Sequence, residues 1–250
     1  MKTLRSAWQI LASWLLCFIV GPFACLVVFL TLGTVRRRFT PWILGLWGHW
    51  MLWIAGVRIT VEGAEHLATD THKVALFNHG SVLDAFLVTA IMPAGGTAAI
   101  KNEVMLYGPV GITVKLLGFL MIDRGNSPKA RRTMERAAER MRRERLTVFI
   151  SPEGTRSPVG ELLPFKKGAF HLALDSGAPI VPVLFDGAFD LHPPGRFTTT
   201  PGLVRIRILP PRPTHFTAAD VATEAEAVRQ LYITELARFR AERTAPAARP

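Results

Sequence analysis

The chain opens with a long apolar stretch, because residues 6–35 include no charged side chain. Gly21 and Pro22 interrupt it, and a proline costs a helix interior about 3 kcal/mol. Divided there, the stretch gives halves of 15 and 13 residues, each shorter than the roughly 20 residues that span a bilayer. The pattern therefore predicts a helical hairpin inserted into one leaflet, with a single kinked spanning helix as the alternative.

Basic residues frame this apolar segment. No Asp or Glu precedes Glu62, whereas Lys and Arg occur at Lys2, Arg5, Arg36, Arg37, Arg38 and Arg58. Lys and Arg favour the cytoplasmic side of membranes, next to anionic headgroups. A hairpin keeps the clusters before and after it on that side, whereas a spanning helix separates them. A cleaved signal peptide fits poorly, because the apolar run is too long and no cleavage motif precedes a polar start.

Beyond Val57, short β-branched runs alternate with helical patterns, which predicts an α/β fold. Strands are expected at 57–61, 73–77, 146–150 and 203–209. Residues 129–145 predict an amphipathic helix with Met134, Ala137, Ala138 and Met141 inward, its charged face solvated or, alternatively, facing a membrane. A last helix is expected over about 218–243. We expect membrane-docking helices over 1–56, an α/β domain over 57–210, and a C-terminal helix with a flexible tail over 211–250.

Composition and charge narrow the classes of partner. The 250 residues carry 30 Lys or Arg against 19 Asp or Glu, a net charge of +11, and 49% are hydrophobic. This composition argues against disorder, and it is more typical of a lipid surface than of a nucleic-acid binder. Scattered histidines and the lack of metal or nucleotide fingerprints predict neither metal nor nucleotide cofactor. Cys17 and Cys25 lie in the apolar segment and predict no disulfide framework or nucleophile.

One expected strand runs directly into residues with the chemistry of a general base. KVALF is followed by NHGSVLD, in which His79 precedes Asp84 by five positions. Five residues are about 140° apart on a helix, so His79 must lie on a loop before it. Ser81 is then a suitable N-cap with Asp84 at N3, and Asp84 reaches back to one imidazole nitrogen while the other serves as base. A purely structural His–Asp pair is the alternative.

A second expected strand also ends in a polar loop. LTVFI leads into SPEGTRS, which contains Glu153, Gly154, Thr155 and Arg156. Glycine permits close backbone approach, threonine and backbone N–H groups donate hydrogen bonds, and arginine presents a planar fork to phosphate. An ordinary turn with a Glu153–Arg156 ion pair is the alternative. Both loops follow the carboxyl ends of expected strands, where open α/β sheets bind ligands.

Taken together, four motifs resemble the ordered blocks of the glycerolipid acyltransferase family typified by 1-acylglycerol-3-phosphate acyltransferase. They are NHGSVLD, GFLMIDR, SPEGTRS and IVPVL at 180–184. The resemblance extends to KNEV and PFKKGAF, covers about residues 57–210, and implies a sheet flanked by helices. Gly80 and Ser151 depart from the residues common at those positions, Gln and Phe, which leaves the shape of the acceptor site open.

The resemblance implies a role for each matching residue. His79 matches the general base and Asp84 the carboxylate that orients it. Arg156 matches a phosphate ligand of the acceptor site. The residues expected to bind substrate are Lys101, Arg124, Glu153, Gly154, Thr155 and Arg156. Backbone N–H groups near Ser81 are candidates for stabilising an oxyanion.

The implied reaction moves a fatty acyl group from a thioester, acyl-CoA or acyl carrier protein, to the free hydroxyl of 1-acylglycerol-3-phosphate. Its product is phosphatidic acid, an intermediate of phospholipid biosynthesis. We expect no resident cofactor and no metal or nucleic-acid partner. The expected location is the bacterial inner membrane, with the site on the cytoplasmic side. Alternatives are another lysolipid acceptor, including lyso-ornithine lipid, and a non-catalytic membrane-binding module.

Overall fold

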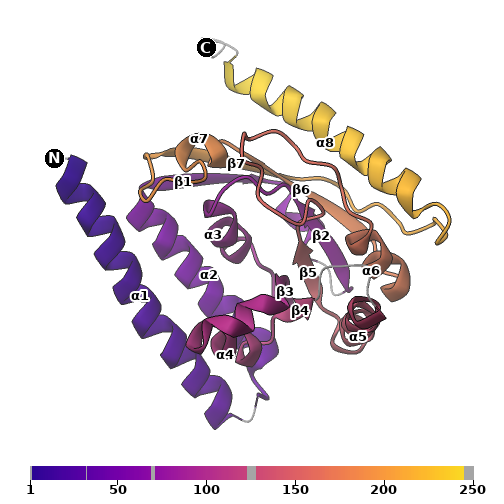
Figure 1. The fold of residues 1–250 in the computed structure, drawn as a ribbon, viewed down its shortest axis with the longest axis horizontal. Helices are drawn as coiled ribbons and strands as arrows, with labels where there is room; N and C mark the ends of the chain where they lie inside the picture. Colours follow the sequence, from indigo (N-terminus) through magenta and orange to yellow (C-terminus); the bar gives the residue numbers. More distant parts are fainter. Residues whose placement is uncertain (1, 32, 69–70, 123–127, 245–250) are drawn as a thin grey trace.

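The computed structural model describes residues 2–31, 33–68, 71–122 and 128–244. Its middle layer is a seven-stranded sheet with the order β1-β7-β6-β2-β5-β3-β4 (Figure 1). Strand β6 is parallel to β2 and antiparallel to β7, whereas β2, β5, β3 and β4 pair in parallel. The carboxyl ends of β2, β5 and β6 therefore meet at one edge. The strands are β1 (Val57–Glu62), β2 (Lys73–Phe77), β3 (Gly96–Lys101), β4 (Leu120–Ile122), β5 (Thr147–Ile150), β6 (Ile180–Asp186) and β7 (Gly202–Ile208).

Helices cover both faces of the sheet, and strand β2 shows why. Val74 and Leu76 are buried on one face, with α5 (Pro128–Glu144), α6 (Gly168–Ser176) and α8 (Val221–Thr244). Ala75 is buried on the other face, with α2 (Arg36–Ala55) and α3 (Leu83–Ala90). A strand covered on both faces reads as a continuous apolar run. The expected α/β fold with helices around the sheet is confirmed.

Most elements lie where the periodicity places them. The four expected strands correspond to β1, β2, β5 and β7 within one or two residues. Helix α5 confirms the amphipathic prediction, because Ala137, Ala138 and Met141 are buried and Met134 packs at the edge of the same cluster. The expected tail after residue 244 lies outside the described residues. Shorter helices are η1 (Ala64–His66), η2 (Asn102–Tyr107), α4 (Pro109–Leu116) and α7 (Ala188–Leu191).

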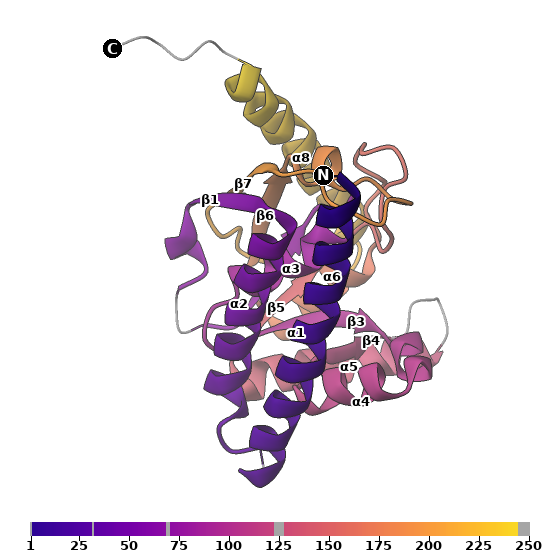
Figure 2. The ribbon, with the colours of Figure 1, turned by 90° about the vertical axis from the view of Figure 1, so that its left-hand side faces the viewer.

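The predicted break at Gly21 and Pro22 is wrong, because α1 (Lys2–Leu30) is continuous. A proline removes one donor from this 29-residue helix, and contacts hold the helix on both sides of it. Gln9 Nε2 donates to the carbonyl of Ala55 (3.1 Å), and Ala24 is buried in the core. The hairpin is formed instead by α1 and α2, which lie side by side in Figure 2 and in contact.

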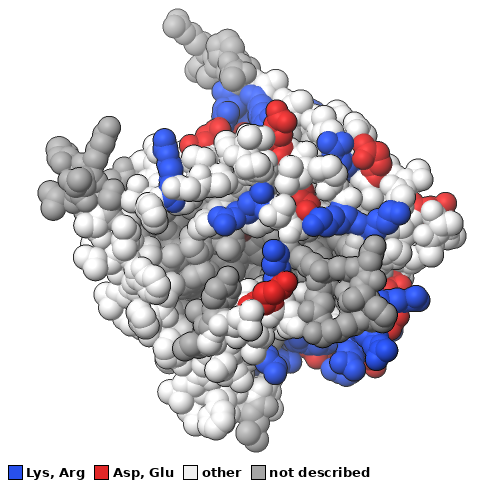
Figure 3. Space-filling model, viewed as in Figure 1, with Lys and Arg blue, Asp and Glu red and all other residues white. Residues whose placement is uncertain are grey.

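Helix α1 leaves large apolar side chains uncovered along its outer face. The described residues Ala7–Leu30 form one helix long and apolar enough to cross a membrane, by length and composition. In Figure 3 the side of the molecule where α1 lies is almost entirely white, whereas charged residues gather over α5 and α8. An exposed apolar surface of this extent marks a membrane or protein contact. Its most exposed members on α1 include Trp8, Leu11, Trp14, Leu15, Phe18, Ile19, Phe29 and Leu30, and α2 adds the exposed Trp42, Trp50 and Trp53.

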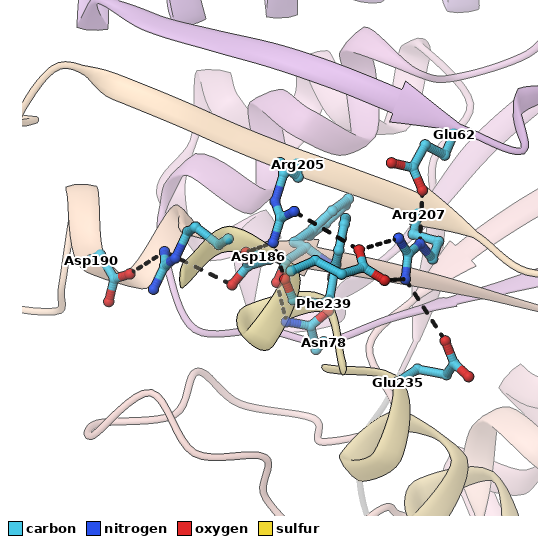
Figure 4. A network of polar contacts seen from close by, with 11 residues as sticks. Glu62, Asn78, Asp186, Asp190, Arg205, Arg207, Glu235 and Phe239 are labelled. Atoms are coloured by element: carbon cyan, nitrogen blue, oxygen red, sulfur yellow. Dashed lines mark hydrogen bonds and ion pairs between the residues drawn. The ribbon is translucent and has the colours of Figure 1, made fainter. Parts of the chain in front are cut away.

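A cluster around Phe239 fixes helix α8 to the sheet (Figure 4). The fully buried ring lies between the guanidinium groups of Arg205 and Arg207, each with Cζ 4.1 Å from the ring centroid. Arg205 pairs with Asp186 at the end of β6 (2.9 Å). Cation–π contacts and ion pairs of this kind reinforce one another in partly buried settings. Arg207 completes the cluster by pairing with Glu62 on β1 (2.8 Å) and Glu242 on α8 (2.7 Å).

Candidate active site

His79 and Asp84 form the pair that their spacing predicts. His79 Nδ1 lies 2.8 Å from Asp84 Oδ2. The carboxylate is 1% exposed, and the same oxygen accepts hydrogen bonds from the backbone N–H groups of Gly80 (2.9 Å) and Ser81 (2.8 Å). Within the described chain, His79 Nε2 has no hydrogen-bond partner. A carboxylate that holds Nδ1–H leaves the lone pair of Nε2 available as a base.

The Ser81 side chain caps the start of helix α3, and Asp84 accepts from the Ser81 N–H in return, which confirms the predicted capping box. Helix α3 is assigned to Leu83–Ala90, and Val82 just before it already has helical backbone angles (φ −63°, ψ −30°). Ser81 Oγ accepts from the N–H of Leu83 (3.2 Å) and donates to the carbonyl of His192 (2.8 Å). The amides of Gly80, Ser81 and Leu83 are therefore all engaged inside the loop. These three donors do not supply the oxyanion stabilisation expected near Ser81.

Asn78 sets the point where the chain leaves the sheet, a role that sequence reasoning missed. Its side-chain amide donates to the carbonyl of Phe185 (3.0 Å) and accepts from the N–H of Phe185 (2.8 Å). The side chain thus extends the β2–β6 ladder by one step, and His79 is the first residue beyond it. The available signal was an amide residue between an apolar strand and the histidine.

Glu153 holds the backbone of the loop that carries His79. Its carboxylate is 2% exposed, and Oε1 accepts from the backbone N–H of His79 (2.6 Å) while Oε2 accepts from Leu163 (2.9 Å). Burial raises the pKa of Glu153 to about 7, against the two backbone hydrogen bonds that lower it. Among the described residues no ion pair joins Glu153 to Arg156, so the simple-turn interpretation is wrong. Glu153 links two loops instead.

The other predicted substrate residues lie at varied distances from this centre. Gly154 is buried with φ +71°, and a Cβ there would meet the side chain of Lys166 at 3.0 Å. Thr155 and Arg156 are exposed. Burial lowers the pKa of His192, and the charge of Arg156 lowers it further. Lys101 is exposed at the end of β3, and Arg124 lies outside the described residues.

An open pocket of about 330 Å³ surrounds His79. Its walls come from the two motif loops, residues 159–162, residues 185–190 at the end of β6 and just beyond it, and helix α8. Leu236, Arg240 and Arg243 are the contributions of α8, spaced to share one helix face. Sequence reasoning missed these three residues, although that spacing was visible. Arg156 and Lys101 are not among the lining residues.

A glycine brings the loop after the second motif close to the pocket wall. Gly160 has φ +79°, and a Cβ there would lie 2.6 Å from the ring of Phe189. Gly80 faces the same ring with room to spare, because its Cβ would lie at 3.6 Å. Of these two positions, only residue 160 requires glycine for both its backbone conformation and its close approach to the ring.

The sheet, its flanking helices and the His79–Asp84 pair place the chain in a known class: it belongs to the acyltransferase family, whose sequence model matches residues 58–186. It is 37% identical over 209 residues to human 1-acyl-sn-glycerol-3-phosphate acyltransferase beta, covering 82% of this chain and 74% of that protein. It is 33% identical over 215 residues to the 1-acyl-sn-glycerol-3-phosphate acyltransferase of Limnanthes douglasii, covering 82% and 76%. The resemblance inferred from the four blocks is confirmed.

The fold has a close counterpart among solved structures. The crystal structure of the 1-acyl-sn-glycerophosphate (LPA) acyltransferase PlsC from Thermotoga maritima matches with a TM-score of 0.77. The match covers 95% of this chain and 98% of that chain at 24% sequence identity. It therefore includes the N-terminal helices and α8, which lie outside the residues that the family model matches.

Proposed function

We propose that this protein transfers a fatty acyl group from a thioester to the free hydroxyl of 1-acylglycerol-3-phosphate, forming phosphatidic acid. The observation that carries the proposal is the geometry of His79, whose ring is fixed by buried Asp84 and opens into a pocket. The names of the relatives, all 1-acyl-sn-glycerol-3-phosphate acyltransferases, support this acceptor. The thioester is acyl-CoA or an acylated carrier protein, and no resident cofactor is needed.

The residues present supply a complete proton path for this reaction. His79 Nε2 takes the proton of the acceptor hydroxyl as its oxygen attacks the thioester carbonyl, and Asp84 stabilises the resulting imidazolium. The tetrahedral intermediate then expels the thiolate, which takes the proton back from His79. The C–S bond breaks, the ester C–O bond forms, and the histidine returns to its neutral state. General base catalysis of this kind contributes about 10² to 10⁴ in rate.

Arg156 is our proposed ligand for the phosphate of the acceptor, with Lys101 and Arg124 as further candidates. Arg156 is exposed two residues beyond Gly154, on the loop whose Glu153 lines the pocket. From there a guanidinium can meet a headgroup that enters from the membrane surface, while the hydroxyl reaches His79. Arginine suits a phosphate because its planar fork makes two parallel hydrogen bonds.

We also propose that the protein docks onto one leaflet, on the cytoplasmic side of a bacterial inner membrane, through the outer face of α1. Helix α1 lies along the α/β domain and packs on α2 and α4, an arrangement that suits a helix lying in the interface better than one crossing the bilayer. A lysolipid keeps its acyl chain in the leaflet, and the soluble thioester arrives from water. Replacing Trp14 and Phe18 by Ser should reduce sedimentation with vesicles without loss of folding.

The decisive experiment measures thioester consumption by the purified full-length protein with 1-acylglycerol-3-phosphate as acceptor. His79→Ala should lower kcat by about 10² to 10⁴, whereas the exposed-histidine control His49→Ala should not. Near-normal turnover of His79→Ala at equal abundance would overturn the general-base role. If the wild type consumes thioester only with another lysolipid, that lysolipid is the acceptor. If it is inactive with every lysolipid, the protein is a non-catalytic membrane module.

The phosphate role of Arg156 has its own test. Arg156→Ala should raise the KM for the acceptor about tenfold, because a charge-assisted pair is lost. The control is Arg131→Ala, which removes an 85% exposed arginine from α5. An effect confined to the KM of the thioester donor would contradict the assignment.

A further inference from the structure

A second pocket, of about 220 Å³, lies at the opposite edge of the sheet from His79. Leu146 and Gly96 line it at the amino ends of β5 and β3, whereas the catalytic loops follow the carboxyl ends of β2 and β5. The start of α2 and the last turns of α5 form its other walls. The mechanism proposed above uses none of these residues.

Positive charge predominates in this second pocket. Three arginines line it against one carboxylate, and they come from two helices: Arg36 and Arg37 from α2, Arg140 from α5. Glu144 engages Arg140 (3.2 Å) and Arg36 (3.6 Å). Arg37 forms no side-chain hydrogen bond or ion pair with any described residue. The pocket therefore holds more guanidinium groups than its own carboxylate can neutralise.

A buried hydroxyl without a partner marks the same wall. Thr40, one turn after Arg36, is 4% exposed and lines the pocket, and its Oγ1 makes no hydrogen bond within the described structure. Burying a hydroxyl without a partner is unfavourable, so such groups call for an explanation. A ligand oxygen drawn into the pocket would supply the missing acceptor.

Glycines shape the pocket so that the arginines lie against backbone. Gly118 has φ +87°, and a Cβ there would lie 2.9 Å from Arg36 Nε. At Gly95, with φ +75°, a Cβ would lie 3.4 Å from Arg37 Nε. The start of α2 adds the positive end of a helix dipole, and its first turn carries no acidic residue. The glycines leave room for the arginines, and the arginines and the start of α2 together favour an anion.

We propose that this pocket binds a phosphate group, held by Arg36, Arg37 and Arg140 with a hydrogen bond from Thr40. A phosphate suits it because three acceptor oxygens and one or two negative charges match converging guanidinium groups. The pocket adjoins the turn between α1 and α2, beside the apolar surface of α1, so a phospholipid headgroup is one source and free phosphate in solution is the other. The inference does not depend on the acyl transfer proposed above.

The first test measures binding of inorganic phosphate to the purified protein as an increase in unfolding temperature, at matched ionic strength in chloride. Arg37→Gln should weaken phosphate binding about tenfold, as expected for one charge-assisted bond. The matched control is Arg38→Gln, its exposed neighbour outside the pocket lining, which should change binding less than about twofold. Thr40→Val should weaken binding without a change of charge and without lowering the unfolding temperature in chloride.

The second test separates the two sources. Binding to phosphatidylcholine vesicles is compared with binding to vesicles that also contain phosphatidylglycerol. If a headgroup fills the pocket, phosphatidylglycerol should increase vesicle binding by the wild type and by Arg38→Gln more than it increases binding by Arg37→Gln. If free phosphate is the ligand, all three proteins should respond alike to the lipid and differ only in the first test. The proposal is overturned if Arg37→Gln and Arg38→Gln behave alike in both tests.

Discussion

The backbone N–H of His79 donates a 2.6 Å hydrogen bond to Glu153 Oε1. The histidine is thus held twice, at its ring by Asp84 from the first turn of α3 and at its backbone by Glu153 from the loop after β5. The second oxygen of Glu153 accepts from the N–H of Leu163. Because both oxygens serve backbone donors, Glu153 acts on the geometry of the pocket rather than on the reacting atoms.

Burial of Glu153 makes the stability of the protein depend on pH. The pKa of Glu153 is about 7 in the folded protein against 4.5 ordinarily, so between those pH values the folded state binds more protons than the unfolded state. The free energy of unfolding should therefore fall as pH rises from about 4.5 to 7, by on the order of 3 kcal/mol from this group, and stay level above. Chemical denaturation of wild type and Glu153→Gln across this range measures it. A difference between the two proteins that does not vary with pH would contradict the assignment.

Asp84→Asn should reduce both catalysis and stability, whereas His79→Ala should reduce catalysis alone. Oδ2 accepts three hydrogen bonds, and an amide in its place carries no charge to stabilise the imidazolium. We expect kcat to fall about 10²-fold or more and the free energy of unfolding to drop by about 1–3 kcal/mol. His79→Ala should lose comparable activity with less than about 1 kcal/mol of stability, because its side chain is partly exposed. An active Asp84→Asn variant would sink the orienting role.

Gly160 and Gly80 offer a matched pair of substitutions against one ring. Gly160→Ala should displace Phe189 into the pocket and strain a left-handed backbone, which costs roughly 1–2 kcal/mol, and should raise the KM of a substrate. Gly80→Ala should be tolerated, because its Cβ meets Phe189 at an ordinary 3.6 Å. Thermal unfolding and steady-state kinetics of both variants provide the check. Equal effects of the two alanines would show that the ring does not form a rigid wall.

The environment of Phe239 predicts a distant effect on the pocket. Phe239→Leu removes the ring between Arg205 and Arg207, and we expect a loss of about 1–3 kcal/mol in the free energy of unfolding. Since the same helix supplies Leu236 and Arg240 to the pocket, KM should rise more than kcat falls. Ile233→Leu, at a partly exposed position of α8, is the control. A destabilised variant with unchanged KM would mean that the cluster around Phe239 does not position the pocket wall.

The sequence pattern predicted those elements whose structure depends on neighbouring residues in the chain. The buried strands β2 and β5 are continuous β-branched and apolar runs, and each ends in the polar motif that lines the pocket. The contact between His79 and Asp84 followed from their five-residue spacing, because only a loop before a helix brings them together. Helix α5 followed from its strong amphipathic period.

Contacts between distant parts of the chain determine the features that the sequence pattern did not predict. Pro22 argued for a break, yet packing of α1 on α2 and α4 keeps the helix continuous. The hydroxyl of Ser81 that caps α3 also donates to the carbonyl of His192, 111 positions away, a contact that no local pattern indicates. Asn78 and Leu163 act on the site by bonding to Phe185 and Glu153, and α8 lines the pocket. These partners lie too far along the chain for a local sequence pattern to indicate them.

The C-terminal helix has a consequence for how such enzymes diversify. The residues that match the family end at 186, yet α8 closes the pocket with Leu236, Arg240 and Arg243 from beyond that boundary. A change in this helix can therefore reshape the space around the substrates while leaving His79, Asp84 and Glu153 untouched. The pocket wall on α8 and the His79–Asp84 pair thus come from separate parts of the chain, so substitutions in α8 can alter which lipids fit without touching the reacting pair.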